Sequence, residues 1–209
     1  MSTYSRAEAE EALNPFHGRI RHVIDGAFQD LLELRSCLKA KGVAPFIYDR
    51  TTANILFDFV IQRANAEFGT DPDVRVIDQS QTVKFCFGDK VLLRFKKGDK
   101  DHLGRNLLTQ AVIDFVSVET FLPGMPPAAA KVEILYSMND LETEIESVIV
   151  AARDGDQMLW HYEIDSPGAG NVVGLPLSTP PSDDGEDDDE LLVRPRSRPA
   201  DSESDSESD

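Results

Sequence analysis

The sequence predicts an α+β fold in which N-terminal helices pack on a mostly antiparallel sheet of five or six strands. Apolar residues recur at helical spacing up to about residue 70, and from Val74 they alternate with polar residues at the period of a β-strand. After Asp165 the sequence becomes rich in proline, glycine, serine and acidic residues. We therefore expect one domain over residues 1–166 and a disordered acidic tail over residues 167–209.

Two helices are expected in the N-terminal part of the domain. The first begins at Asn14-Pro15, because Asn caps free amides and Pro suits a first helical turn, and it ends before Gly42. The second begins at residue 51 or 52 and stops at Gly69. The first helix has an apolar stripe with steps of three and four residues, made of Phe16, Ile20, Val23, Ala27, Leu31, Leu34 and Leu38.

A β-hairpin is expected around a turn at Gly88 and Asp89. A three-residue loop, Gly88–Lys90, makes one face of this hairpin wholly apolar, whereas a two-residue loop would mix apolar and charged side chains. The preferred register also places Lys84 opposite Arg94 on the face away from the core, where both are available to an anionic partner. Its apolar pairs are Phe87 with Val91, Phe85 with Leu93, and Val83 with Phe95.

Three further elements complete the domain. A helix is expected over Leu107–Phe121 and a strand over Val132–Met138, whose alternate residues share one apolar face. Asp154-Gly155 is typical of a type I′ turn and predicts a final hairpin with a two-residue loop. That loop pairs Ala151 with Met158, Ile149 with Trp160, and Ile145 with Ile164.

The net charge of −17 is unevenly distributed along the 209 residues. Residues 183–209 contain 12 acidic residues and 3 arginines, which gives −9 and leaves −8 for the rest of the chain. This charge argues against binding to nucleic acid, because phosphates would be repelled. We find no apolar signal segment and no run of ~20 apolar residues, so we expect a cytoplasmic protein without a transmembrane segment.

The residue pattern predicts no catalytic residues, metal site or cofactor. His17 and His22 are five residues apart on a helix, which turns them about 140° from each other and does not suit a shared metal. The two cysteines, Cys37 and Cys86, lie in apolar patterns and are expected to be buried free thiols. A magnesium-dependent nuclease would need a second carboxylate where Thr82 stands.

One segment, Lys84–Arg105, is basic: it holds seven lysines or arginines and three aspartates, a net of +4. The protein's own acidic groups, or lysines that protect an edge strand, would explain this charge without a ligand. The alternative is an anionic partner, namely an acidic protein surface, a phosphate, or the lipid head groups of a membrane surface. The candidate binding residues are Lys84, Arg94, Lys96, Lys97, Lys100, Arg105, Asn106 and Gln110.

The segment Val91–Met125 resembles a family of uncharacterised bacterial and phage proteins. The similarity is carried by three strings, VLLRFKK, GRNLLTQ and LPGMP. Members of that family look like toxin partners in two-gene toxin–antitoxin or phage-defence modules, including those of prophages, beside a gene for an ImmA/IrrE-type, zinc-peptidase-like protein. The resemblance implies that this chain is a toxin neutralised by its neighbour, and it assigns no chemistry to the matching basic residues.

Two functional hypotheses follow from the sequence. The first is a toxin-type effector that acts by binding and is neutralised by a protein partner. The second is a non-catalytic adaptor or regulatory module that binds protein partners through its hairpin and its tail. The acidic tail either solubilises the protein, shields the basic hairpin, or imitates nucleic-acid charge. An enzyme of unrecognised class is a third alternative, without a supporting motif.

Overall fold

The computed structural model describes residues 5–44, 46, 48–79, 82–98, 110–117 and 129–165. Its helices are α1 (Arg6–Leu13), α2 (His17–Ala40), α3 (Asp49–Phe68) and α4 (Gln110–Val116), with a 3₁₀ turn, η1 (Asn14–Phe16). Its strands are β1 (Val74–Gln79), β2 (Thr82–Phe87), β3 (Val91–Lys97), β4 (Ala130–Met138), β5 (Ile145–Asp154) and β6 (Gln157–Glu163). The predicted α+β class is confirmed, and the predicted tail lies outside the described residues.

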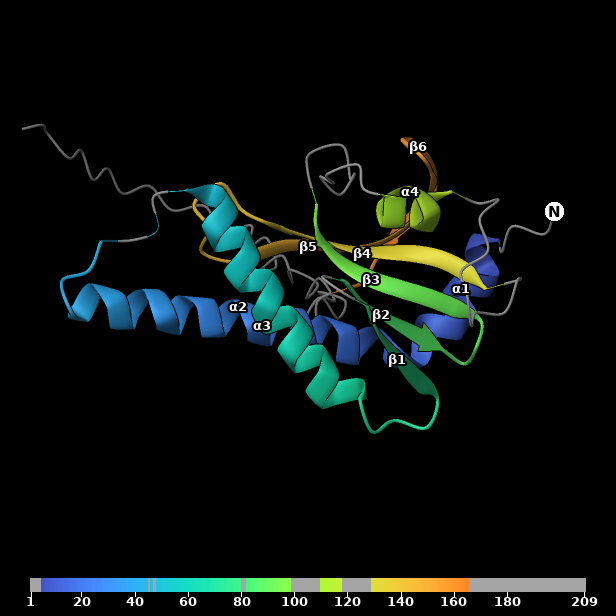
Figure 1. Ribbon diagram of the computed structural model, residues 1–209, viewed down its shortest axis with the longest axis horizontal. Helices are drawn as coiled ribbons and strands as arrows, with labels where there is room; N and C mark the ends of the chain where they lie inside the picture. The colour runs from blue at the N-terminus through green and yellow to red at the C-terminus, as the bar shows by residue number, and fades with distance from the viewer. Residues whose placement is uncertain are drawn as a thin grey trace, which may run out of the picture. The chain divides into compact units, whose positions relative to one another are not determined.

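The six strands form one sheet in the order β1-β2-β3-β4-β5-β6 (Figure 1). Four of the five neighbouring pairs are antiparallel, and β3 pairs with β4 in parallel. The sheet therefore consists of two three-stranded antiparallel meanders joined along one parallel seam. Parallel neighbours need a crossover connection, and here residues 98–129, which include α4, connect β3 to β4.

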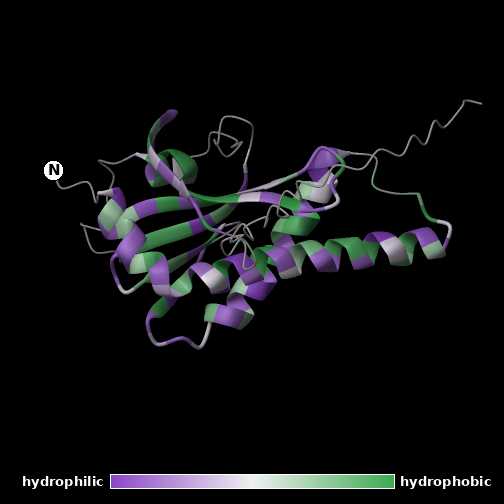
Figure 2. Ribbon diagram, turned by 180° about the vertical axis from the view of Figure 1, so that it is seen from behind, coloured by the Kyte–Doolittle hydropathy of each residue, from purple (hydrophilic) through white to green (hydrophobic). Residues whose placement is uncertain are grey.

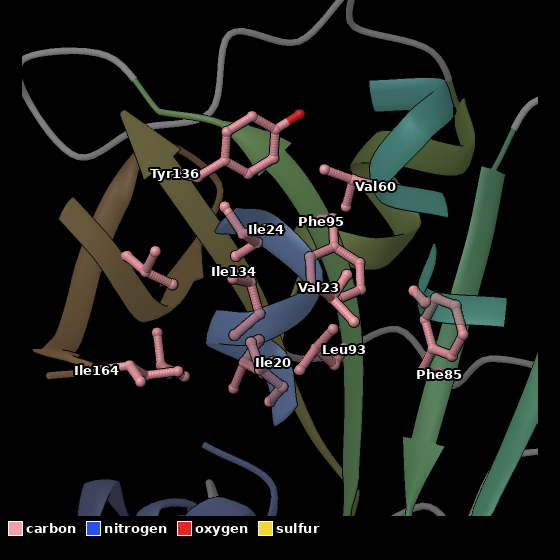
Figure 3. Close-up of a cluster of buried hydrophobic side chains, with 14 of the residues drawn as sticks. Ile20, Val23, Ile24, Val60, Phe85, Leu93, Phe95, Ile134, Tyr136 and Ile164 are labelled. Carbon is pink, nitrogen blue, oxygen red and sulfur yellow. The ribbon is translucent and has the colours of Figure 1, made fainter. Parts of the chain in front are cut away.

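The main core lies between the sheet and the two long helices. Figure 3 shows Ile20, Val23 and Ile24 of α2 beside Leu93 and Phe95 of β3. The alternate strand residues that face these helices are fully or almost fully buried, because every second side chain of a strand points to the same face. The other strand face meets α4, through a smaller buried cluster of Cys86, Leu92, Phe115 and Val116.

The start of the helical region differs from the prediction. A separate helix, α1, begins after Ser5, whose hydroxyl accepts from the Glu8 amide while the Glu8 carboxylate accepts from the Ser5 amide. This reciprocal capping box was present in the sequence as Ser-x-x-Glu. Asn14 is not the expected side-chain cap, because it lies in η1, where the chain continues into α2.

The end of α2 agrees with the prediction. Gly42 has a positive φ of 70°, which only glycine adopts without strain. The Val43 amide donates to the Leu38 carbonyl at 3.0 Å and the Gly42 amide donates to the Lys39 carbonyl at 3.0 Å. These two bonds form a Schellman motif, which satisfies the last carbonyls of the helix.

The predicted stripe of α2 is buried only up to Leu31. Beyond that residue Leu34 and Leu38 are partly buried, and Cys37 is exposed, which corrects the expectation of a buried thiol. The cause is the length of the helix, since the C-terminal part of α2 extends past α3 (Figure 1). Figure 2 shows that apolar and polar positions still alternate along this part of α2.

The two hairpins test the predicted registers differently. In the β2–β3 pair, Phe85 lies opposite Leu93 and Phe87 opposite Val91, so the three-residue loop is confirmed. In the β5–β6 pair, the loop is Gly155-Asp156, one residue later than predicted, and only Gly155 has a positive φ. The type I′ assignment is therefore wrong, and a register shift between Ala152 and Arg153 moves the later partners further.

The predicted pairs of the last hairpin are replaced by others. Observed partners are Arg153 with Met158, Ala152 with Trp160, Ala151 with His161 and Ile149 with Glu163. The shared face of β4 is confirmed, since Val132, Ile134, Tyr136 and Met138 all belong to or contact the main core. Of the predicted helix Leu107–Phe121, the structure describes α4, Gln110–Val116, and Ser117, which lies outside that helix.

Truncation of Phe85 tests the main core. Phe85 is fully buried, and its ring centroid lies 6.1 Å from that of Phe68 and 5.7 Å from that of Phe95. We expect Phe85→Ala to lower the free energy of unfolding by about 3–5 kcal/mol, through lost burial and the cavity that remains. Urea denaturation measures this change. Leu141→Ala, at a residue that is 81% exposed, should change it by less than about 0.5 kcal/mol.

Candidate functional site

The sheet face opposite α2 and α3 carries a group of charged side chains that we call the cationic layer. It comprises five cationic residues and one carboxylate: Lys84, Arg94, Lys96, Lys131, Arg153 and Glu133. Their positions follow from strand alternation, because each occupies the face that its apolar neighbours leave. Charged groups at such positions are rare unless they are paired.

The centre of the layer is an Arg–Glu–Arg triad. Register places Arg94 of β3 directly opposite Glu133 of β4 across the parallel seam. Oε1 of Glu133 accepts from Nε of Arg94 at 2.8 Å, from Nη2 of Arg94, and from Nη2 of Arg153 at 3.3 Å. The exposed fractions of Arg94, Glu133 and Arg153 are 2%, 1% and 8%, so this triad is interior.

One contact within the triad is incomplete. Nε of Arg153 lies 2.8 Å from Oε2 of Glu133, but the two atoms are not aligned for a hydrogen bond. Both atoms are buried and, within the described part of the chain, neither has a hydrogen-bond partner. The contact is therefore a close ion pair that leaves a buried donor unsatisfied.

Helix α4 covers part of the layer through Phe115. The guanidinium carbon of Arg94 lies 4.2 Å from the centroid of this ring, and Nζ of Lys84 lies 5.7 Å from it. Both distances suit cation–π contacts, which are strongest where water is excluded. The ring therefore holds the Arg94 side chain on one side while Glu133 holds it on the other.

Lys131 anchors the C-terminal end of α4. Its Nζ donates to the carbonyl of Asp114 at 3.0 Å and to that of Ser117 at 2.7 Å. The Gly155 amide, from the turn between β5 and β6, donates to the Val116 carbonyl at 3.2 Å. A lysine at this position matches the partial negative charge of a helix C-terminus.

Burial lowers the pKa of all three lysines in the layer, and the negative charge of Asp114 opposes this shift in Lys84 and Lys131. Desolvation is the largest cause for Lys84 and Lys96, and the positive charge of Arg94 adds to it in both. Arg153 lowers the Lys96 pKa further, whereas Glu133 raises it. Desolvation also lowers the pKa of Arg94, against the opposing effect of Glu133. The cations of the layer thus repel one another in a poorly solvated place.

The structure brings together only part of the predicted binding set. Lys84 and Arg94 share one face as expected, but both are buried and Arg94 is paired with Glu133, so their predicted availability at the surface is wrong. Lys96 joins them and is partly exposed. Lys97 lies on the other face, opposite Tyr136 in register, beside the main core.

The other four predicted residues lie partly or wholly outside the described structure. Lys100, Arg105 and Asn106 are outside the described residues, and Gln110 is described only as the first residue of α4. Sequence reasoning also missed Lys131, Glu133 and Arg153, which come from strands that are distant in sequence. The available signal was a charged residue within an apolar strand, as in Val-Glu-Ile at 132–134.

Comparison of the chain with models of protein families, with curated proteins and with solved structures finds no match. Among the described residues, no three or more histidine, cysteine, aspartate or glutamate side chains are grouped so that they could hold a metal ion. No helix in the same part of the chain has the length and apolar character needed to cross a membrane. The most unusual chemical feature of the described residues is the cationic layer.

Replacement of Glu133 tests the role of the triad. Glu133→Gln keeps the shape of the side chain but removes the counter-charge of two buried arginines, so we expect a loss of about 3–5 kcal/mol in the free energy of unfolding. Chemical denaturation measures the loss. As a matched control, Glu142→Gln removes the partner of Arg35 at a more exposed ion pair and should cost less than about 1 kcal/mol.

The pKa shift of Lys96 predicts a pH-dependent stability difference. Its folded-state pKa lies below the ordinary value of 10.5, so the folded protein binds fewer protons than the unfolded chain between these two values. The charged amine therefore destabilises the fold most at neutral pH, and this cost fades as the pH rises toward 10.5. We expect Lys96→Met to be more stable than the wild type at pH 7, with a gap that narrows by pH 10. Urea denaturation across this range measures the gap, and a gap that widened with pH would contradict the assignment.

Proposed function

We propose that this protein is the toxin-type effector of a bacterial or phage two-gene module, that it acts in the cytoplasm, and that a protein partner neutralises it. We further propose that it acts by binding an anionic group at the cationic layer. The observation that carries the binding role is an excess of positive charge: among the described residues, Lys96, Arg94 and Arg153 lie around one carboxylate, that of Glu133. The module context rests on the resemblance carried by residues 91–125.

The charge excess supports binding because buried cations are costly without a counter-ion. Glu133 offsets the two arginines only in part, and the pKa of Lys96 is lowered by both desolvation and its cationic neighbours. An anion that reached Lys96 would remove this repulsion. The arginines are already held by Glu133 and Phe115, so little side-chain freedom would be lost on binding.

The segment that resembles the toxin family contributes directly to this site. It includes β3, which supplies Arg94 and Lys96, and α4, whose Phe115 covers Arg94. If the resemblance reflects a shared role, that role involves the centre of the sheet and its second face. An adaptor would instead be expected to bind its partners through surface residues.

Expression in a bacterium tests the module proposal. We expect growth arrest when the protein is produced alone from an inducible promoter, and recovery when the neighbouring gene of its native locus is expressed with it. Colony counts and growth curves measure both effects. Harmless expression at protein levels confirmed by immunoblotting would reject the toxin proposal and favour the adaptor.

Two charge reversals on one strand link toxicity to the layer. Lys96→Glu places a carboxylate next to Arg94 and Arg153 and should abolish toxicity, because two carboxylates then balance these two arginines. Lys97→Glu makes the same change on the opposite face of β3 and should leave toxicity unchanged. If both variants are folded by circular dichroism and lose toxicity to the same extent, the toxic activity does not depend on the cationic layer.

A further inference from the structure

We propose that the cationic layer binds the dianionic phosphate group of a phosphomonoester or of free phosphate, with Lys96 as the entry residue. This inference rests on the proposed function, since it names the chemical class of the anion bound there. It concerns four residues that we call the Lys96 corner: Lys96, Arg94, Arg153 and Glu133.

The Lys96 corner has an unbalanced charge of +2. Lys96, Arg94 and Arg153 contribute +3 and Glu133 contributes −1, and within the described ranges Arg94, Arg153 and Glu133 are the charged groups that act on the Lys96 amine. Within the described part of the chain, the side-chain amine of Lys96 makes no hydrogen bond and no ion pair. A phosphomonoester above its second pKa of about 6 carries a charge close to −2 and would balance the corner, whereas one carboxylate would leave +1.

The burial of the corner selects a small ligand. Arg94 and Arg153 have exposed fractions of 2% and 8%, so an acidic protein surface has no direct access to them. Lys96 is partly exposed and can meet a compact group from solvent. A phosphate group is small, and its several oxygens can accept from an ammonium and a guanidinium at once.

The arginines of the corner are prepared for an anion. Arg94 is held between Glu133 and the ring of Phe115, so its guanidinium position is set before binding. The Nε of Arg153 is a buried donor with no aligned acceptor among the described residues. An unsatisfied buried N–H destabilises the protein, because its hydrogen bond to water has been lost and not replaced. An additional oxygen that accepted from this N–H would remove that cost.

Phosphate titration of the purified full-length protein tests the inference. At pH 7.5 and constant ionic strength, we expect phenyl phosphate and inorganic phosphate to bind in calorimetry and to raise the melting temperature. Dimethyl phosphate is a monoanionic diester and leaves one positive charge unbalanced. Its affinity should therefore be lower than that of phenyl phosphate by about tenfold or more. Phosphatidic acid vesicles in a flotation assay distinguish a lipid monoester from a soluble one.

Variants on the two faces of β3 provide the matched comparison. Lys96→Met should weaken phenyl phosphate binding by about tenfold or more, and Lys97→Met should leave it unchanged. Lys96→Glu supplies an internal carboxylate and should fold without responding to phosphate, which keeps the test decisive if Lys96→Met is poorly folded. Equal effects at both lysines, or equal affinity for dimethyl phosphate, would overturn the inference, as would a wild-type protein that binds no phosphate.

The two proposals fail separately. Toxicity that persists in a protein without phosphate binding would overturn only the ligand assignment. Harmless expression of a protein that binds phosphate through Lys96 would overturn only the toxin role.

Discussion

The carboxylate of Glu133 is the group on which the second face of the sheet depends. It meets Arg94 across the parallel seam and Arg153 from the next strand. Without it, the interior would hold cations that repel one another. The ion pair also specifies strand register, because a slip of two residues along β3 would bring Glu133 opposite Leu92 or Lys96.

The two faces of the sheet are stabilised in different ways. On the first face, α2 and α3 bury a continuous apolar core, and the aromatic rings of Phe68, Phe85 and Phe95 meet edge to face. On the second face, the apolar contacts form two small clusters, and the charged side chains of the cationic layer share this face with them. Such a face tolerates less change at a single residue, since each ion needs its partner.

Periodicity in the sequence was sufficient to predict the shared apolar face of β4, the β2–β3 register and the buried part of α2. These features depend on local spacing and on the requirement that one face be apolar. The burial of Arg94 could not be predicted in the same way, because its partner Glu133 lies 39 residues later in the chain. The apolar stripe of α2 likewise gave no indication that the helix extends past its packing partner, which leaves Cys37 exposed.

The last hairpin shows a different limit. Asp154-Gly155 indicated a turn at the correct place, but the position of glycine within the loop and a bulge in β5 together decided the register. A change of one residue in the loop reverses which face each side chain occupies. Arg153 still reaches the cationic layer, because its face is set by alternation along β5, where Ala151 lies opposite Glu133.

The parallel seam has a kinetic consequence for the whole domain. The meanders β1–β3 and β4–β6 each join neighbouring strands through short turns, so their contacts are local and their closure is fast. The seam between them requires residues 98–129 to bring distant strands together, and the entropy lost in that closure precedes any gain from pairing. We expect the two meanders to assemble early and their union along β3 and β4 to limit the folding rate. A nascent chain would thus expose one edge of its first meander until the second half emerged from the ribosome.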